Sequence, residues 1–400
     1  LRIAEAGHSV AIVEREGFLG GILMQCIHNG FGLHWFNEEL TGPEFAEKLI
    51  EKVRASAKIE VFLDTTVMEI AHDRVTKSLT VCGPKTGVRR LNAQTVVLAM
   101  GCRERNRGNL GIPGTRPSGI FTAGLAQRLI NIEGYLPGRR VVVVGSGDIG
   151  LIMARRMTWA GAKGLGVIEI LPHPSGLTRN IVQCLDDFGI PLYLNHIVTR
   201  IDGKDRVEGI EAAPFEGGAI MLEKAFHIEC DTILLSVGLI PENELSKAAG
   251  VRIAPATGGP EVDARLMTSL PGVFACGNVL HVHDLVDWVA EEATRCGEEA
   301  VSYLEGIGLG RAQGRAVAGA NVRYIVPNYY IAGEENRFSF RSLVVKDRGE
   351  LVVRQDGVVR KRRILRKIKP AEMLHVTLSA DELPIQREGA APAQVEVSIE

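Results

Sequence analysis

The chain has 400 residues, a mass of 43.4 kDa and a formal net charge of −2. It is long enough for two or three domains that each bury a core, which argues against a small binding module. Apolar residues make up 46% and charged residues 24% of the sequence. This composition is typical of a globular α/β protein, and it argues against disorder and against a basic surface for nucleic acid.

Cysteine spacing and hydropathy indicate the cellular setting. Seven cysteines are spread along the chain without a CxxC or CxxxxC pair, which favours a reduced, cytoplasmic environment. No apolar run reaches the roughly 18 to 20 residues that a membrane span needs. We therefore expect no direct membrane span, and any membrane association would come through a partner.

The first hundred residues alternate between helical and extended patterns. Residues 1–6 have the pattern of a helix end, followed by an apolar strand at 10–13 and a helix at 44–55. Because the sequence has no initiator Met and no strand before this helix end, we expect a truncated start. Three short strands with charged turns predict an antiparallel insertion in a parallel sheet. They lie at 66–70, 78–82 and 88–91.

Further along the chain, short β-branched strands predict parallel sheets that are buried on both faces. These strands lie at 96–99, 141–144, 165–170 and 233–237. Helices are expected at 149–160, 180–188 and 284–304, and a glycine follows each of the first two.

Beyond about residue 314 polar and apolar residues alternate, which predicts a small β domain. Its strands are expected at 342–346, 351–354 and 358–365. Asp356 and Gly357 are predicted to form the hairpin turn between the last two. The chain end, which contains alanine and proline, is expected to be frayed.

The strongest local signal is the strand at 141–144, which runs into a GxGxxG loop and then a helix. Such a loop lets the backbone approach a pyrophosphate, and the helix N-terminus offers free N–H groups to it. Glu169 follows at the end of the next strand, where an acid can accept hydrogen bonds from both ribose hydroxyls and would repel a 2′-phosphate. The pattern predicts NAD rather than NADP, and the alternatives are a plain glycine turn or another nucleotide. The loop residues are Gly145, Ser146, Gly147, Asp148, Ile149 and Gly150.

The start of the chain has the pattern of the second half of an equivalent unit. The strand at 10–13 ends at Glu14 and Arg15, and Glu14 would take the ribose role that Glu169 takes in the other unit. The preceding strand and glycine loop are not in the sequence. Without them this unit would lose the main cradle for a pyrophosphate.

Together these features resemble the two-dinucleotide-domain flavoprotein family that includes the pyridine nucleotide-disulfide oxidoreductases, over about 1–310. Residues 95–101 (TVVLAMG) and 232–238 (TILLSVG) resemble the strand-to-glycine crossings between that family's domains, and 270–278 (LPGVFACGN) resembles its late FAD motif. The resemblance implies an α/β fold with two Rossmann-like, glutathione reductase-like domains plus the small β domain. The expected domains are FAD-binding at 1–106 and 241–312, NAD(P)-binding at 107–240, β at 315–385, and a tail at 386–400.

The resemblance also implies the cofactor contacts. Asn278 stands where the family usually has Asp, and its amide can still donate and accept hydrogen bonds. The helix at 284–304 would aim the positive end of its dipole at the flavin N1/C2 region. The implied FAD contacts are Glu14, Arg15, Gly20, Gly21, Ala99, Gly101, Gly277 and Asn278, and the implied NAD contacts beyond the glycine loop are Glu169, Val237 and Gly238.

Residues 20–30 (GGILMQCIHNG) stand where disulfide reductases of the family carry paired redox cysteines. Only Cys26 is present, so a disulfide relay is not expected. Cys26 is either a catalytic thiol or a small packing residue. His28 either exchanges protons near flavin N5 or is an ordinary loop histidine.

Three motifs resemble a narrower group of flavoprotein subunits, which accompany glycerol-3-phosphate dehydrogenase-like oxidoreductases and have relatives in opine, proline and hydrogen cyanide-forming dehydrogenases. This resemblance implies that the partner is a second flavoprotein and that the protein is oligomeric. Several relatives carry an iron–sulfur cysteine cluster near the C-terminus, and here no Cys follows Cys296, which argues against the amine-dehydrogenase version. The motifs lie at 20–32, 174–191 and 277–287.

Two other clusters are assigned less specific roles. His281 and His283 lack a convincing third ligand, so no metal is expected; Asp284 is predicted to cap the following helix, with the histidines next to the flavin. The basic run at 360–367 is interpreted as a solvated face or a docking patch for an acidic partner protein rather than a nucleic-acid site.

The leading hypothesis is an FAD enzyme that transfers hydride between NAD(P)H and flavin and exchanges electrons with a partner flavoprotein. One alternative is a component of an amino-acid or hydroxy-acid dehydrogenase, with a structural nucleotide such as ATP in the second domain. Another is a non-catalytic assembly protein.

Overall fold

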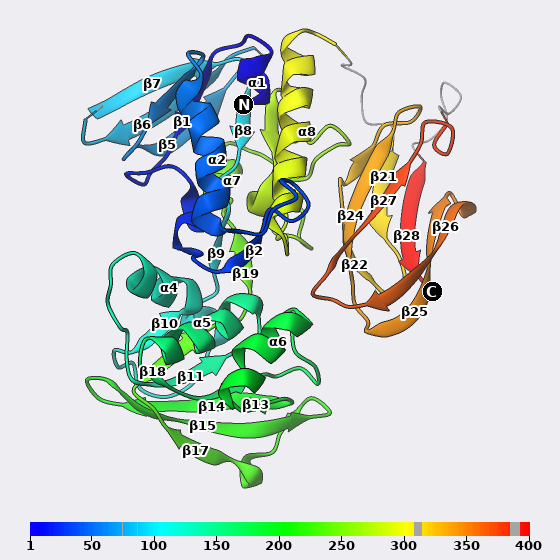
Figure 1. The fold of residues 1–400 in the computed structure, drawn as a ribbon. Helices are drawn as coiled ribbons and strands as arrows, with labels where there is room; N and C mark the ends of the chain where they lie inside the picture. Colours follow the sequence, from blue (N-terminus) through cyan, green and yellow to red (C-terminus); the bar gives the residue numbers. More distant parts are fainter. Residues whose placement is uncertain (74, 86, 308–313, 385–392) are drawn as a thin grey trace. The chain divides into compact units, whose positions relative to one another are not determined.

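A computed structural model describes the chain apart from residues 74, 86, 308–313 and 385–392. The described residues form two compact units (Figure 1). The first comprises Leu1–Cys102 and Pro241–Glu400, and the second Arg103–Ile240. The chain passes between them in β9 (Cys102–Glu104) and β19 (Leu239–Pro241).

The second unit is built on a five-stranded parallel sheet in the order β10-β18-β11-β12-β13. Val141 and Val143 face a cluster formed with the helices, whereas Val142 and Val144 face a cluster formed with the antiparallel strands. Because side chains alternate along a strand, both faces of the sheet are buried, as the sequence predicts. The sheet strands are Ile120–Thr122, Thr232–Leu235, Arg140–Val144, Lys163–Ile168 and Leu192–Tyr193 in sheet order.

The helices and antiparallel strands cover this sheet. The helices are α3 (Arg107–Leu110), α4 (Ala123–Asn131), α5 (Asp148–Trp159) and α6 (Thr178–Cys184), and the strands are β14 (His196–Gly203), β15 (Val207–Glu216), β16 (Ala219–Ile220) and β17 (Phe226–Glu229). The expected helix at 180–188 is α6 followed by a short 3₁₀ turn, Asp186–Phe188.

In the first unit two parallel pairs occupy the place of one sheet. β1 (Val10–Val13) pairs with β4 (Ile59–Phe62), and β8 (Val96–Leu98) pairs with β20 (Val273–Ala275). No strand of the described part of the chain joins the two pairs. The helices are α1 (Arg2–Glu5), α2 (Gly42–Ala55), α7 (Glu244–Ala248) and α8 (Val286–Leu304), and a short hairpin is formed by β2 (Asn29–Phe31) and β3 (Leu40–Thr41).

The predicted antiparallel insertion is confirmed. β5 pairs with β6, and β6 with β7, in antiparallel register. Val81 at the centre is fully buried. The three strands are Thr66–His72, Lys77–Gly83 and Gly87–Ala93.

The C-terminal region has two sheets around one apolar core, in the orders β23-β21-β28-β25-β26 and β22-β24-β27. The hairpin turn at Asp356 and Gly357 is confirmed, because both have positive φ and join two antiparallel strands. The strands from β21 to β28 are Gly314–Ala318, Val322–Val326, Tyr329–Tyr330, Asn336–Ser342, Lys346–Gln355, Val358–Ile368, Met373–Leu378 and Gln394–Ile399.

Two predictions for this region are wrong. The strand expected at 342–346 is the gap between β24 and β25, where the hydroxyl of Ser342 donates to the carbonyl oxygen of Val344 and accepts from its N–H. The frayed tail expected at 386–400 is wrong for Gln394–Ile399, which forms β28 between β21 and β25. Its alternate residues, Val395, Val397 and Ile399, are fully buried, so the alternation there was a strand signal. Residues 385–392 of that tail lie outside the described residues.

Candidate cofactor sites and an adjoining cavity

The glycine loop of the second unit joins β11 to α5. A Cβ at Gly145, whose φ is 89°, would lie 2.1 Å from the carbonyl oxygen of Ser236, and one at Gly150 would lie 2.5 Å from the Ser236 Cβ. Glycine at both positions therefore lets the start of α5 approach the end of β18. With Gly147 as N-cap and Asp148 as the first helical residue, the first turn has backbone N–H groups of the kind that bind phosphate.

Glu169 lies beside this loop and is buried. Its Oε2 accepts hydrogen bonds from the N–H of Ser146 at 2.9 Å, the Ser146 hydroxyl at 2.5 Å and the Ser175 hydroxyl at 2.7 Å. Its Oε1 accepts from the N–H of Leu171 at 2.9 Å. The carboxylate stands where a ribose would be bound, and the ribose hydroxyls would have to replace the two serine hydroxyls.

The segment at 171–177 is fastened to the same loop. The N–H of Ser175 donates to the Ser146 hydroxyl at 2.9 Å. Asp148 Oδ1 accepts from the N–H of Leu177 at 2.8 Å and from Asn180 Nδ2 at 2.6 Å. Ser175 and Asn180 were not predicted as site residues, although both lie in the sequence motif at 174–191.

The remaining residues assigned to the NAD contacts lie around the loop. Val237 Cγ1 is 3.2 Å from the Cβ position of Gly145, and Gly238 has a φ of 102°. Ile149 packs against the core cluster on the helix-covered face, so its side chain serves the fold.

In the first unit the residues assigned to FAD fall at two places. Glu14 follows β1, where its Oε1 accepts from the N–H of Glu16 at 2.9 Å, and Arg15 is exposed. Gly20 and Gly21 have positive φ, and a Cβ at Gly20 would lie 2.7 Å from the Met24 Sδ. That is compatible with a tight backbone turn next to the end of β1.

The second place is the turn after β20. Gly277 has a φ of 72°, and its N–H donates to Glu292 Oε1 at 2.7 Å. Asn278 Oδ1 accepts from the N–H of His283 at 2.9 Å, while its Nδ2 has only the distant sulfur of Cys102, at 3.6 Å. The amide therefore keeps donor capacity for a ligand. Nearby along the chain from β8, Ala99 is exposed and a Cβ at Gly101 would meet no atom within 4 Å.

The acid at the start of α8 is not the one predicted. Asp284 does not cap the helix; its Oδ2 accepts from the N–H of Met373 at 3.2 Å and its Oδ1 lies 3.7 Å from Arg341 Nη2. Instead Asp287, which is 2% exposed, accepts hydrogen bonds at 2.8–3.2 Å. The donors are the backbone N–H groups of Gly32, His34 and Trp35.

Cys26 and His28 are not brought together with another catalytic group. The Cys26 thiol donates to the carbonyl oxygen of Ile22 at 3.3 Å, and its Cβ would lie 2.8 Å from a Cβ at Gly42. Burial raises the pKa of Cys26 to about 12, so the thiol is protonated at neutral pH. The His28 ring lies 5.1 Å from that of Phe31.

One pair of neighbouring cysteines was not predicted from the sequence. Cys276 and Cys296 are both buried, and a hydrogen bond from one to the other, together with burial, raises the pKa of Cys296 well above its ordinary value. Disulfide substrates would have no direct access to two buried thiols. Proximity of this pair therefore does not restore the missing relay.

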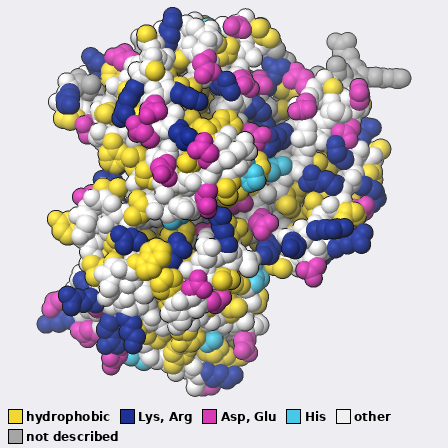
Figure 2. Space-filling model, viewed as in Figure 1, with side chains coloured by type: hydrophobic (Ala, Val, Ile, Leu, Met, Phe, Trp, Pro, Cys, Tyr) yellow, Lys and Arg dark blue, Asp and Glu magenta, His cyan; other side chains and the backbone are white. Residues whose placement is uncertain are grey.

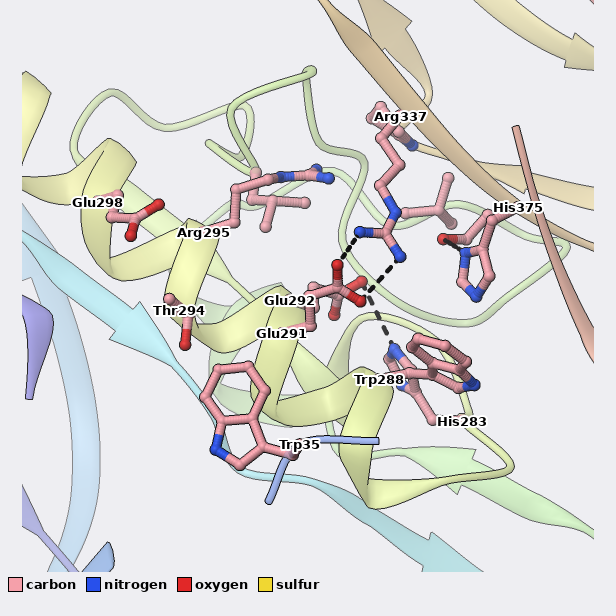
Figure 3. A pocket seen from close by; sticks show the side chains of 14 residues that line it. Trp35, His283, Trp288, Glu291, Glu292, Thr294, Arg295, Glu298, Arg337 and His375 are labelled. Carbon is pink, nitrogen blue, oxygen red and sulfur yellow. Dashed lines mark hydrogen bonds and ion pairs between the residues drawn. The ribbon is translucent and has the colours of Figure 1, made fainter. Parts of the chain in front are cut away.

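A cavity of about 220 Å³ lies against α8 (Figure 3). Glu291 on α8 forms a two-point ion pair with Arg337 of β24, and Arg295 extends over the cavity from the same helix. Burial, followed by the charge of Arg337, lowers the pKa of His375 to about 4. The cavity wall thus holds charged groups together with a neutral imidazole.

One part of that wall contradicts the expectation that the two histidines lack a third ligand. His281 Nε2 lies 2.8 Å and His283 Nε2 lies 3.5 Å from Glu292 Oε2. Burial lowers the pKa of His281. Although burial alone would raise it, the two imidazoles hold the pKa of Glu292 below its usual range.

The basic run at 360–367 lies on β26, an edge strand, and Figure 2 shows Lys and Arg side chains gathered on the C-terminal β region. Part of this charge is paired: Lys361 lies 3.0 Å from Glu382, and Arg362 pairs with Glu350. A role in docking an acidic partner stays a prediction. Among the described residues no helix is both long and apolar enough to cross a membrane.

Sequence comparison finds oxidoreductases among the relatives of this chain. It is 31% identical over 211 residues to an NAD(P)H sulfur oxidoreductase (CoA-dependent) of Pyrococcus abyssi, covering 49% of this chain and 44% of that protein. It is 25% identical over 305 residues to one of the opine oxidase subunits of Rhizobium meliloti, covering 70% and 55%. The chain spans about half the length of the curated relatives it matches.

Structure comparison confirms the predicted α/β fold. The crystal structure of T. acidophilum thioredoxin reductase matches with a TM-score of 0.61 at 23% identity, covering 76% of this chain and 93% of that one. The sequence model of the pyridine nucleotide-disulphide oxidoreductases matches residues 1–300. The chain therefore belongs to the pyridine nucleotide-disulphide oxidoreductase family, whose members typically bind FAD and NAD(P)H.

Proposed function

We propose that this chain is the greater part of an FAD-dependent oxidoreductase that transfers hydride between NAD(P)H and flavin. The observation that carries the proposal is the strand, glycine loop and helix of the second unit, in which Gly145 and Gly150 are held against Ser236 with no room for a Cβ. Such a loop has a specific use in binding a pyrophosphate at the helix start.

Glu169 supports NAD as the nucleotide. Its carboxylate lies within hydrogen-bond distance of the glycine loop, where it would accept from ribose hydroxyls and repel a 2′-phosphate. The other acid of the loop, Asp148, is bonded to Leu177 and Asn180. Its charge would lie near the phosphates and would weaken their binding.

The residues of the first unit fit two ends of FAD. Glu14 at the end of β1 fits the adenosine ribose, and Gly277 with Asn278 fits the ribityl-phosphate arm because the turn has a positive φ and a donor amide. The loop that would cradle the pyrophosphate is not among these residues. Flavin and nicotinamide would supply the redox chemistry, and the chain would bind and orient them.

Electron exchange with a second flavoprotein is part of the proposal. It is supported by the likeness to the opine oxidase protein of Rhizobium meliloti, whose name marks it as one component of a multi-subunit oxidase. An internal disulfide relay is not proposed, because Cys26 has no cysteine partner in its own segment and Cys276 and Cys296 are buried.

A second candidate is a dehydrogenase component that holds a structural nucleotide such as ATP in the second unit. The four hydrogen bonds that already satisfy Glu169 favour it, since NAD would have to displace serine hydroxyls. Nucleotide released by denaturing the purified protein, identified by mass, would distinguish a resident ATP from an exchangeable NAD.

The decisive experiment is anaerobic addition of NADH to the FAD-loaded protein while the flavin absorbance near about 450 nm is followed. Bleaching is expected because hydride transfer reduces the flavin. Protein that contains FAD and does not bleach with NADH or NADPH would contradict the nicotinamide role.

A further inference from the structure

We propose that His281, His283 and Glu292 bind one divalent metal ion with nitrogen and oxygen ligands, of the kind that Zn²⁺ represents. This inference goes beyond the oxidoreductase proposal and does not depend on it. The ligand atoms are the two imidazole Nε2 atoms and the Oε2 of the carboxylate.

The spacing of these atoms suits a metal. The three ligand atoms lie within 4.8 Å of one another, with Glu292 Oε2 at 2.8 Å from His281 Nε2 and 3.5 Å from His283 Nε2. Tetrahedral zinc with bonds of about 2.0 to 2.2 Å places its ligand atoms about 3.3 Å apart. Small side-chain shifts would bring the cluster to that geometry.

The orientation of His283 favours a metal over a simple hydrogen bond. Asn278 Oδ1 accepts from the backbone N–H of His283 at 2.9 Å, which fixes the amide with its oxygen toward the ring. The His283 Nδ1, 3.3 Å from the same oxygen, is then suited to carry the ring proton. In the neutral ring this leaves the lone pair of Nε2 facing the Glu292 carboxylate, an arrangement that a cation between them would stabilise.

The charges around the cluster point the same way. The side chains of His281 and Glu292 are 0% and 10% exposed. In the described part of the chain, Glu292 has ion pairs only with the two histidines. The neighbouring acids Glu291 and Asp284 have arginine partners of their own. A buried carboxylate without a cationic partner is costly, and a metal ion would provide the missing charge.

The ligand set leaves room for a fourth ligand. Three protein ligands with an open position are typical of zinc sites that bind water or a substrate. His283 and Glu292 line the cavity (Figure 3), so that ligand could come from there. The other Glu292 oxygen is held by the N–H of Gly277, which orients the carboxylate as outer hydrogen bonds do in metal sites.

The test is metal binding by the full chain after removal of any affinity tag and treatment with EDTA. Titration with ZnCl₂ followed by calorimetry is expected to show one ion per chain with micromolar or tighter affinity. CoCl₂ should give visible absorption bands as a second readout. His283→Gln should weaken Zn²⁺ binding by at least about tenfold, because one of three ligands is lost.

His375→Gln is the matched control, since His375 lines the same cavity without belonging to the cluster. It should bind Zn²⁺ like the wild type. Added Zn²⁺ should also raise the unfolding temperature of the wild type and not that of His283→Gln, which shows that the variant folds. Wild-type protein that binds no Zn²⁺ or Co²⁺, or a His283→Gln variant that binds as tightly as the wild type, would overturn the proposal.

Discussion

The carboxylate of Glu169 accepts hydrogen bonds from both the backbone N–H and the hydroxyl of Ser146, the second residue of the glycine loop. The acid and the loop are thus linked before any ligand is considered. A nucleotide that binds here has to compete with groups of the protein itself.

Glu169→Gln is expected to weaken NADH binding by about tenfold or more, because hydrogen bonds to a charged group contribute roughly 1.5 to 3 kcal/mol. The dissociation constant can be measured by NADH fluorescence. Glu223→Gln, at an exposed position of the same unit, is the control and should bind normally. Equal affinity in both variants would separate Glu169 from the ribose.

Ser175→Ala removes one hydroxyl that occupies Glu169 Oε2. We expect NADH to bind a few times more tightly, and the free energy of unfolding to fall by about 1 kcal/mol for the lost hydrogen bond. The same fluorescence titration and a urea denaturation curve measure the two effects. Weaker binding would mean that Ser175 contacts the nucleotide rather than competing with it.

Cys26 should react slowly in the folded protein. Because burial raises its pKa to about 12, only about one thiol in ten thousand is ionised at pH 8. The rate of alkylation by iodoacetamide, read at this residue by mass spectrometry, should rise steeply only as the pH approaches that value. Cys26→Ala should keep flavin reduction by NADH, and its loss would restore a catalytic role for the thiol.

Asp287→Asn is expected to lower the free energy of unfolding by about 2 kcal/mol. The side chain is buried and accepts from three backbone N–H groups, and the neutral amide accepts less strongly. Urea denaturation measures the change, with the exposed Asp347→Asn as control. A variant as stable as the wild type would show that these bonds contribute little.

His375 should make the protein less stable in acid. Its pKa is about 4 in the fold and about 6.5 in an unfolded chain, so below about pH 6.5 only the unfolded state takes up the proton. The unfolding free energy should therefore fall between pH 6.5 and 4, by at most about 3 kcal/mol. The difference between wild type and His375→Gln isolates this contribution, and parallel pH profiles would contradict it.

Local sequence signals predicted much of the fold. The strand at 141–144 and its glycine loop are encoded in adjacent residues, and so is the hairpin turn at Asp356 and Gly357. The expected strand at 342–346 failed because a short apolar run does not distinguish a strand from a turn with exposed Leu343 and Val345.

The groups that were missed depend on tertiary packing. Glu292 reaches His281 only because α8 packs against the turn after β20. The choice of Asp287 over Asp284 depends on where the segment at 32–35 lies. Residue spacing carries no record of either contact.

β28 has a consequence for synthesis. It fills the place between β21 and β25, yet it begins 80 residues after β21 begins (394 − 314). While the chain emerges from the ribosome, the edge of β21 that β28 will cover has to wait without this partner, and exposed strand edges are sites of unwanted association. Nascent chains stalled before residue 394 should therefore bind chaperones that the completed sheet no longer engages.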